Sequence, residues 1–388
     1  MKRLIIAAFA MLLLSCTTSS TDSIINDEDS LKKGFEEIIS RHTAVGLQVA
    51  AVKDGKIVYT ESFGYKNLEE KTTIGNNDIL RIASISKTFV ATAIMQLVEQ
   101  GKVNLDADIS SYMGFQLRNP NFPNTPITVR MLLSHTSSLS DANGYFTLDN
   151  LNPAVSPTWQ KAWNNYEPGS RYQYCNLGFN TLGAIIEIAS GKRFDTYMKE
   201  NIFTPLGVYA SHNVADLDPH KFIGIYSYNS SNNYFTRTES AYAIPDLENY
   251  KMGYSTPVFS PTGGVKISAG DLAKVMIMHM NWGTAADGTR IISEESSRMM
   301  QSEITPTNYP GESYGMAMIS TNDLFKSARA TGHDGLALGA YTAMYWIREK
   351  NFGVVVMTNG CTGKTDKAFA NILCESAELL KTYFCPAN

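Results

Sequence analysis

The chain has 388 residues, of which 44% are hydrophobic and 18% charged, the composition of an ordinary globular protein with a large core. Its formal net charge is −4 and no run of Lys and Arg is interleaved with aromatic residues, which excludes nucleic acid as an expected partner. One large domain, or two closely joined lobes, is therefore expected.

The N-terminus has the pattern of an export signal. Lys2 and Arg3 precede an apolar run over residues 4–14 that is too short to span a bilayer core. No later stretch is apolar over a membrane-spanning length. We therefore expect the body of the protein to be exported and to lie beside a membrane instead of within it.

The signal ends in Leu13-Leu14-Ser15-Cys16, which resembles the lipobox of bacterial lipoproteins. The resemblance implies a signal peptide over residues 1–15, and a lipid anchor on Cys16 with a flexible tether over residues 16–30. The protein would then lie in the bacterial cell envelope (periplasm), held to a membrane by its lipid. The alternative is an ordinary cleaved signal that happens to be followed by a cysteine.

Four further cysteines and six histidines give no indication of a metal site. Outside the cytoplasm Cys175, Cys361, Cys374 and Cys385 could pair in three ways or remain buried free thiols, and the sequence does not choose. They form no Cys-x-x-Cys pair, and the histidines are too scattered for a helical His-x-x-x-His pair. We therefore expect neither a metal ion nor a cofactor.

Patterns typical of β-strands occur near both ends of the chain. The elements expected there are a helix over 31–39, a β-hairpin over 46–64 that turns at Lys53-Asp54-Gly55-Lys56, strands over 340–347 and 352–359, and a helix over about 366–384. The simplest assembly places both ends of the chain in one sheet.

The middle of the chain has helical periodicity, notably over residues 89–100, 177–190 and 271–282. We expect an α/β protein of the α+β type, in which an antiparallel β-sheet is flanked by helices and accompanied by a mainly helical second lobe. The domain would cover residues 31–385, with the helical lobe inserted at about 95–255. A cleft between the two lobes is the natural place for a site.

Ser84 and Lys87 form a candidate nucleophile and base. Ser84 opens a predicted helix whose apolar stripe stops at Gly101, and Lys87 lies nearly one turn later on the same face. A partly desolvated lysine with a lowered pKa can activate a serine hydroxyl, and the helix N-terminus favours a developing oxyanion. The alternative is a helix cap with a solvated lysine, and residues 30–33 also match Ser-x-x-Lys, but no buried helix follows them.

Two more motifs follow the Ser84-Ile85-Ser86-Lys87 segment, namely Tyr174-Cys175-Asn176 and His333-Asp334-Gly335. In order and spacing the three resemble the motifs of the penicillin-recognising serine hydrolases, in the branch that holds class C β-lactamases and D-Ala-D-Ala carboxypeptidases. Flanking segments agree over nearly the whole mature chain, among them residues 132–137 and 263–265. The resemblance implies a β-lactamase/transpeptidase-like fold.

The resemblance also implies roles for the first two motifs. Ser84 would attack a carbonyl and form an acyl-enzyme, with its activation shared by Lys87 and Tyr174. Tyr174 would pass the proton to the leaving group, and Asn176 would hold the substrate's amide. Which of Lys87 and Tyr174 is the base stays open. His135, in a loop, is interpreted as a structural, hydrogen-bonded group.

The third motif is expected on an edge strand, where the backbone N–H of Leu336 would join that of Ser84 in an oxyanion hole and Gly335 would leave room for the substrate. His333 stands where β-lactamases of this branch have lysine. A histidine is only partly charged near neutral pH, so weaker binding of a carboxylate is expected, which argues against a dedicated β-lactamase. Cys175 is interpreted as a packing residue.

These patterns together favour a serine hydrolase acting on amide bonds of D-amino-acid-containing cell-wall peptides. An esterase or weak class C-like β-lactamase is the first alternative, and a non-catalytic penicillin-binding receptor or sensor is an alternative of another class. The expected partners are a small peptide, ester or β-lactam substrate and, through the lipid anchor, a membrane. The sequence gives no oligomeric state.

Overall fold

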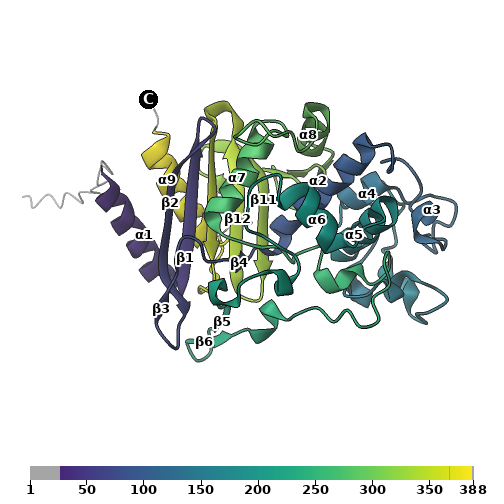
Figure 1. Ribbon diagram of the computed structural model, residues 1–388, viewed down its shortest axis with the longest axis horizontal. Helices are drawn as coiled ribbons and strands as arrows, with labels where there is room; N and C mark the ends of the chain where they lie inside the picture. Colours follow the sequence, from purple (N-terminus) through teal and green to yellow (C-terminus); the bar gives the residue numbers. More distant parts are fainter. Residues whose placement is uncertain (1–26, 367, 387–388) are drawn as a thin grey trace, which may run out of the picture.

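The computed structural model of the protein, shown in Figure 1, describes residues 27–366 and 368–386. The export signal, Cys16 and most of the tether therefore lie outside the described residues. A sheet with helices on both faces forms one side of the molecule, and a mainly helical lobe forms the other (Figure 1). Within the described ranges, no helix combines the length and apolarity needed to cross a membrane.

The sheet has nine strands in the order β3-β2-β1-β13-β12-β11-β10-β9-β8, with antiparallel neighbours throughout. It joins the two ends of the chain, because Leu47 in β1 pairs with Thr358 in β13. Asp54 and Gly55 make the first hairpin turn with positive φ angles of 50° and 73°, as this dipeptide favours. The strands are β1 (Gly46–Lys53), β2 (Lys56–Asn67), β3 (Thr72–Thr73), β8 (Thr305–Pro306), β9 (Ser313–Tyr314), β10 (Ile319–Phe325), β11 (Ala328–Ala337), β12 (Ala340–Ile347) and β13 (Phe352–Thr358).

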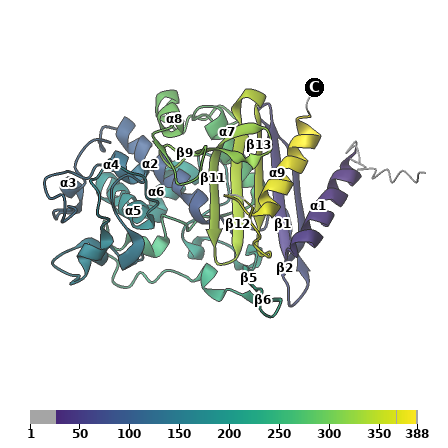
Figure 2. The ribbon, with the colours of Figure 1, turned by 180° about the vertical axis from the view of Figure 1, so that it is seen from behind.

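Helices cover both faces of the sheet, so β1 and β13 are buried along almost their whole lengths. The helix α7 (Ala269–Met280) lies on the face seen in Figure 1. The helices α1 (Glu28–His42) and α9 (Asn371–Phe384) lie on the opposite face (Figure 2). Burial on both faces explains why the central strands are apolar runs instead of alternating apolar and polar residues.

Two helix ends differ from the expectation. The first helix begins at Glu28, not residue 31, because the Asp27 side chain accepts a hydrogen bond from the Ser30 N–H (2.7 Å) and caps it. The last helix begins at Asn371, not about residue 366. The preceding residues instead form a bridge between Thr365 and Ala370.

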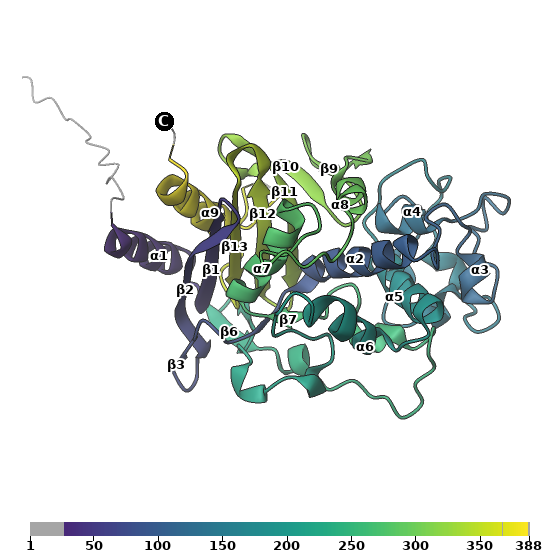
Figure 3. The ribbon, with the colours of Figure 1, turned by 45° about the horizontal axis from the view of Figure 1, so that its top comes forward.

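The helical lobe is built around α2 (Ser86–Glu99), which runs from the sheet into that lobe and is buried over most of its length (Figure 3). α5 (Asn176–Ser190) packs against it. The other helices of more than one turn are α3 (Ser110–Met113), α4 (Val129–Leu133), α6 (Phe194–Met198) and α8 (Glu294–Gln301), and the short ribbons are β4 (Leu80–Arg81) with β7 (Lys266–Ile267) and β5 (Tyr226–Asn229) with β6 (Tyr234–Arg237). The predicted fold class is confirmed.

The question of disulfides is decided by the structure. Cys175, Cys361, Cys374 and Cys385 are all free thiols. Cys175 is buried in the second motif, as a packing residue would be.

Candidate active site

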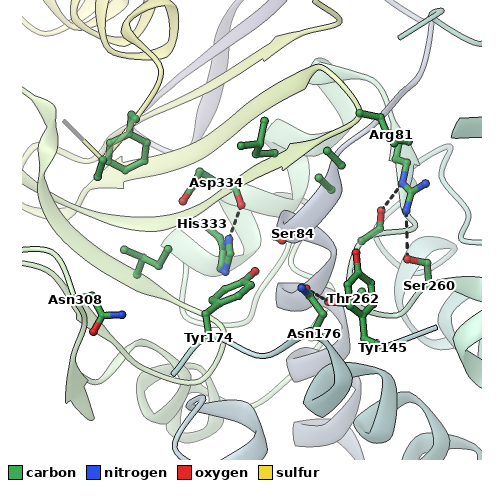
Figure 4. Close-up of a pocket in the computed structure, with 18 of the residues that line it drawn as sticks. Arg81, Ser84, Tyr145, Tyr174, Asn176, Ser260, Thr262, Asn308, His333 and Asp334 are labelled. Atoms are coloured by element: carbon green, nitrogen blue, oxygen red, sulfur yellow. Dashed lines mark hydrogen bonds between the residues drawn. The ribbon is translucent and has the colours of Figure 1, made fainter. Parts of the chain in front are cut away.

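A cavity of about 880 Å³ opens where the edge of the sheet meets the helical lobe. Its wall includes Ser84, which lies between Tyr174 and Asn176 on one side and β11 on the other (Figure 4). The three motifs, which are spread over about 250 residues of sequence, therefore line one cavity. A cavity of this size is large enough for a short peptide or a drug-sized molecule.

Ser84 lies in a tight turn directly before α2. The single 3₁₀ turn Ala83–Ile85 leads into the helix, and Ala83 has a φ of 48°, a left-handed conformation that residues with a side chain rarely adopt. Backbone strain of this kind is concentrated at functional sites. The turn presents the Ser84 side chain to the cavity while Ile85 points into the core.

Gly335 lies against the turn that carries Ser84. A side chain at this position would overlap the carbonyl oxygen of Ile82 and approach the Cβ of Ala83 to 3.0 Å. The glycine therefore makes room for that turn. This close approach holds β11 against the turn that carries Ser84.

The end of β11 forms a local edge of the sheet. β10 pairs with β11 from Phe325 opposite Ala328 to Ile319 opposite Gly332, and no described strand pairs with residues 333–337 on that side. Leu336 is 61% exposed and lines the cavity. The backbone of this segment is thus available to a ligand, although β11 as a whole lies between β10 and β12 and is not the edge strand expected for the third motif.

Lys87 is buried and its amine reaches three oxygens. Its Nζ lies 2.9 Å from Ser84 Oγ, 3.0 Å from Asn176 Oδ1 and 2.9 Å from the carbonyl oxygen of Thr262. The ammonium position also lies 4.7 Å from the centre of the Tyr174 ring. Burial lowers the pKa of Lys87 to about 7, with the more distant charge of Asp141 opposing that shift.

Burial shifts the pKa of Tyr174 in the opposite direction from that of Lys87. Desolvation raises the pKa of its phenol well above the ordinary value, and a hydrogen bond with Ser84 opposes the shift. Near neutral pH the phenol therefore carries its proton, whereas Lys87 is divided between its two forms. Near neutral pH the site therefore holds an amine that can accept a proton and a phenol that can donate one.

Asp141, which the sequence analysis did not single out, fixes the second motif. Its carboxylate accepts hydrogen bonds from the backbone N–H groups of Asn176 and Leu177 (2.9 Å each) and from Asn176 Nδ2 (2.9 Å). The amide of Asn176 must therefore point its oxygen towards Lys87, and Thr262 Oγ1 donates to that oxygen as well (2.6 Å). Asp141 thus caps α5 and orients Asn176.

His333 is neutral, not partly charged as expected. Its Nδ1–H donates to the backbone oxygen of Asp334 (2.6 Å), so its Nε2 accepts from the hydroxyl of Tyr314 (3.0 Å). Burial, with a smaller contribution from Lys87, lowers the pKa of His333 to about 3. The imidazole holds the third motif in place and supplies no positive charge for a carboxylate near neutral pH.

His135 is placed as a structural group. Its Nδ1 accepts the backbone N–H of Cys175 (3.1 Å), and its ring lies 4.2 Å from that of Tyr174, centre to centre. Burial lowers the pKa of His135 well below the ordinary value, so the ring is neutral. The His135 ring therefore packs against the Tyr174 ring and helps to hold it in place.

Thr262 and Asp141 could not have been recognised as site residues from local patterns. Thr262 directly precedes the Gly263-Gly264 pair noted in the sequence, which is the nearest available signal. Asp141 shares no motif with Asn176, from which it is separated by 35 residues.

Comparison with known proteins identifies the family of the chain. A family model described as Beta-lactamase matches residues 31–376. Penicillin-binding protein 4 of Amycolatopsis lactamdurans is 25% identical over 346 residues, which cover 86% of this chain and 86% of that protein. Penicillin-binding protein 4* of Bacillus subtilis (strain 168) is 33% identical over 191 residues, which cover 47% of this chain and 41% of the relative.

Solved structures share the fold. The octameric penicillin-binding protein homologue from Pyrococcus abyssi aligns with a TM-score of 0.71 and 26% identity, covering 91% of this chain and 76% of that one. D-amino acid amidase from Ochrobactrum anthropi SV3 aligns with a TM-score of 0.70 and 20% identity, covering 90% and 97%. The chain belongs to the beta-lactamase family of penicillin-recognising serine hydrolases, and the resemblance seen in its three motifs is confirmed.

Proposed function

We propose that the protein is a serine hydrolase that forms an acyl-enzyme on Ser84, with Lys87 as the base and Tyr174 as the proton donor. The observation that carries the proposal is the 2.9 Å contact between Lys87 Nζ and Ser84 Oγ, made by a buried amine whose pKa is about 7. A nucleophile within hydrogen-bonding reach of a base that is half neutral at working pH is the requirement for this chemistry.

The partners of Lys87 favour it as the base over Tyr174. The oxygens of Asn176 and Thr262 can only accept hydrogen bonds, so they take the two hydrogens of a neutral amine and leave its lone pair for the Ser84 hydroxyl. Tyr174 is protonated at neutral pH because burial raises its pKa. It is therefore suited to give a proton, not to take one.

The reaction then follows in balanced steps. The Ser84 oxygen bonds to the substrate carbonyl while its proton passes to Lys87, and the backbone N–H groups of Ser84 and Leu336 stabilise the oxyanion. As the carbonyl–nitrogen bond breaks, Tyr174 gives its proton to the leaving amine and regains one from Lys87. Water later hydrolyses the ester and returns Ser84 to its starting state.

Amide bonds in D-amino-acid-containing peptides of the cell wall are the favoured substrates. A D-amino acid amidase shares the fold, and two of the matched relatives bear penicillin-binding names. The neutral state of His333 weakens the case for a dedicated β-lactamase, since a fixed cation for the β-lactam carboxylate is missing from that position. An esterase or weak β-lactamase is the first alternative. A receptor that keeps a stable adduct is the non-enzymatic alternative.

The proposed cellular setting is the bacterial cell envelope, where the lipobox-like Cys16 would hold the exported protein to a membrane. Labelling of the full-length protein with a radioactive or clickable fatty acid, in wild type and Cys16→Ala, tests it. Loss of label in the variant is expected. A labelled variant, or an unlabelled wild type, would exclude lipidation at this residue.

A substrate panel tests the enzymatic proposal. Turnover of a D-Ala-D-Ala peptide, a p-nitrophenyl ester and a cephalosporin is measured with wild type and Ser84→Ala, and intact-protein mass spectrometry follows the adduct. We expect a transient adduct and turnover in wild type and neither in the variant. Activity confined to the ester would exclude the peptidase function. A persistent adduct without turnover would indicate a receptor. An adduct on Ser84→Ala would refute the proposed mechanism.

A further inference from the structure

Arg81 is a cation in the wall of the cavity without an acidic partner. Its Nε donates to the carbonyl oxygen of Gly263 (2.8 Å) and its Nη2 to Ser260 Oγ (3.3 Å), both uncharged groups. Among the described residues no carboxylate forms an ion pair with it. A guanidinium has five N–H donors, so three remain for a ligand.

The surroundings of Arg81 add positive charge instead of compensating it. Lys266 pairs with Arg81 across the ribbon of β4 and β7, and it is buried with its Nζ on the carbonyl oxygen of His212 (2.9 Å). Burial and then the charge of Arg81 lower the pKa of Lys266 to about 7. Placing a cation in partly buried surroundings without a counter-ion costs free energy, and such sites are typical of ligand-binding positions.

Arg81 is anchored to the same segment as Lys87. The carbonyl of Thr262 accepts the hydrogen bond of Lys87, and the carbonyl of the next residue, Gly263, accepts that of Arg81. Arg81 and Ser84 line the same cavity. An anion bound at Arg81 would therefore share that cavity with a substrate whose carbonyl is at Ser84.

The opposite end of the cavity is acidic. Asp334 accepts a hydrogen bond from the hydroxyl of Tyr345 (3.1 Å) and Glu312 one from that of Thr307 (2.8 Å), and both line the cavity. In Figure 4 Asp334 and His333 lie on one side of Ser84, whereas Arg81 lies on the other. Burial raises the pKa of both carboxyl groups, that of Glu312 to about 6, and the charge of Lys87 acts against the shift of Asp334.

The two ends correspond to the two parts of the substrate under the proposed function, on which this inference rests. Asn176, which would hold the acyl part, is joined through Thr262 to the Arg81 end of the cavity. Tyr174, which would protonate the leaving group, lies beside His333 and Asp334 (Figure 4). We propose that Arg81 binds a carboxylate in the acyl part of the substrate.

A pair of isosteric substrates tests the proposal. N-acetyl-D-glutamyl and N-acetyl-D-glutaminyl p-nitroanilides share a leaving group and differ only in the charge of the acyl side chain. We expect wild type to prefer the glutamyl compound by about tenfold in kcat/KM, the range of one good charge-assisted contact. Arg81→Gln should bring the ratio to about one by losing the glutamyl activity, and Arg81→Lys should retain part of it.

The ratio separates recognition from a structural role. If Arg81 only supports the segment 260–263, Arg81→Gln lowers both rates and keeps their ratio, which overturns the proposal. Arg171→Gln, which removes an exposed cation outside the cavity wall, is the matched control and should leave the ratio unchanged. Should Arg81→Gln fail to fold, a wild-type ratio at or below one still overturns the inference. Failure of the proposed function would appear separately, as no turnover of either compound.

Discussion

Two buried lysines show that a lowered pKa does not by itself make a base. Burial lowers the pKa of both Lys87 and Lys266 to about 7. Lys266 meets a backbone carbonyl, which has no proton to give, whereas Lys87 meets the hydroxyl of Ser84. The geometry around the amine, and not its pKa, therefore distinguishes the candidate base.

The pKa of Lys87 predicts how acylation depends on pH. The amine must be neutral to accept a proton, so kcat/KM for an uncharged p-nitrophenyl ester should rise as pH passes through about 7 and level off above it. Stopped-flow release of p-nitrophenol measures this. Lys266→Met, which removes the other lysine of similar pKa, should keep the midpoint. A flat profile from about pH 5.5 to about pH 8.5 would contradict the assignment.

The loop that contains Asp141 and the first turn of α5 act as one unit. α5 has no side-chain cap of its own at Cys175, and Asp141 supplies it from 34 residues earlier in the chain. The same carboxylate sets the orientation of Asn176 and, through it, the position of the Lys87 amine. One acidic side chain thus links the stability of a helix to the geometry of the proposed proton transfer.

Replacing Asp141 should therefore affect both properties. Asp141→Ala is expected to lower the free energy of unfolding by about 1–2 kcal/mol through loss of the cap. It should slow acylation by about 100-fold, because Asn176 is no longer held. Asp141→Asn, which keeps one acceptor oxygen, should fall between wild type and Asp141→Ala. Chemical denaturation and the acylation rate measure the two effects, and unchanged acylation in Asp141→Ala would show that Asn176 is oriented by other contacts.

Four of the buried histidines are neutral in the folded molecule because burial lowers their pKa. Burial lowers the pKa of His212, His279 and His333 to about 3, and that of His135 well below its usual value. In the unfolded chain each would titrate near 6.5. Below that pH the unfolded state binds more protons than the folded one, so folding stability falls as the solution becomes acidic.

His279 offers a test away from the candidate site. Its ring stacks on Trp346 (interplanar angle 4°), and its two ring nitrogens have no hydrogen-bond partner among the described residues. His279→Phe should reduce the loss of unfolding free energy below pH 6.5 by at most about 1.4 kcal/mol per pH unit. Urea denaturation at pH 7 and at pH 5 measures this difference. An equal pH dependence in wild type and variant would show that His279 is not a source of acid sensitivity.

The first hairpin, the last two strands and the long helices were predictable because local patterns indicate them, whereas β8 to β11 were not among the elements expected from such patterns. The turn at Asp54-Gly55 has the residues that its positive φ angles require, and the apolar stripe of residues 89–98 is that of a buried helix. The Ser84 and Lys87 pair was accessible for the same reason, since a spacing of three residues fixes their side chains on one helical face. The prediction that Ser84 and Lys87 share one site with Tyr174 and His333 rested on the family resemblance.

By itself, then, the sequence determined what depends on neighbours in the chain: the hairpins, the long helices and the amine placed one turn after the hydroxyl. Only the tertiary structure decided what depends on contacts between distant segments. The packing of Gly335 against Ala83 joins residues about 250 positions apart, and it alone shows why that glycine is needed. The neutral state of His333, and the lack of a carboxylate beside Arg81 among the residues that the structure describes, likewise follow from burial and from which groups face each other across the cavity. Neither the protonation state of His333 nor the surroundings of Arg81 can be predicted from periodicity and spacing, because desolvation and charge act through space and not along the chain.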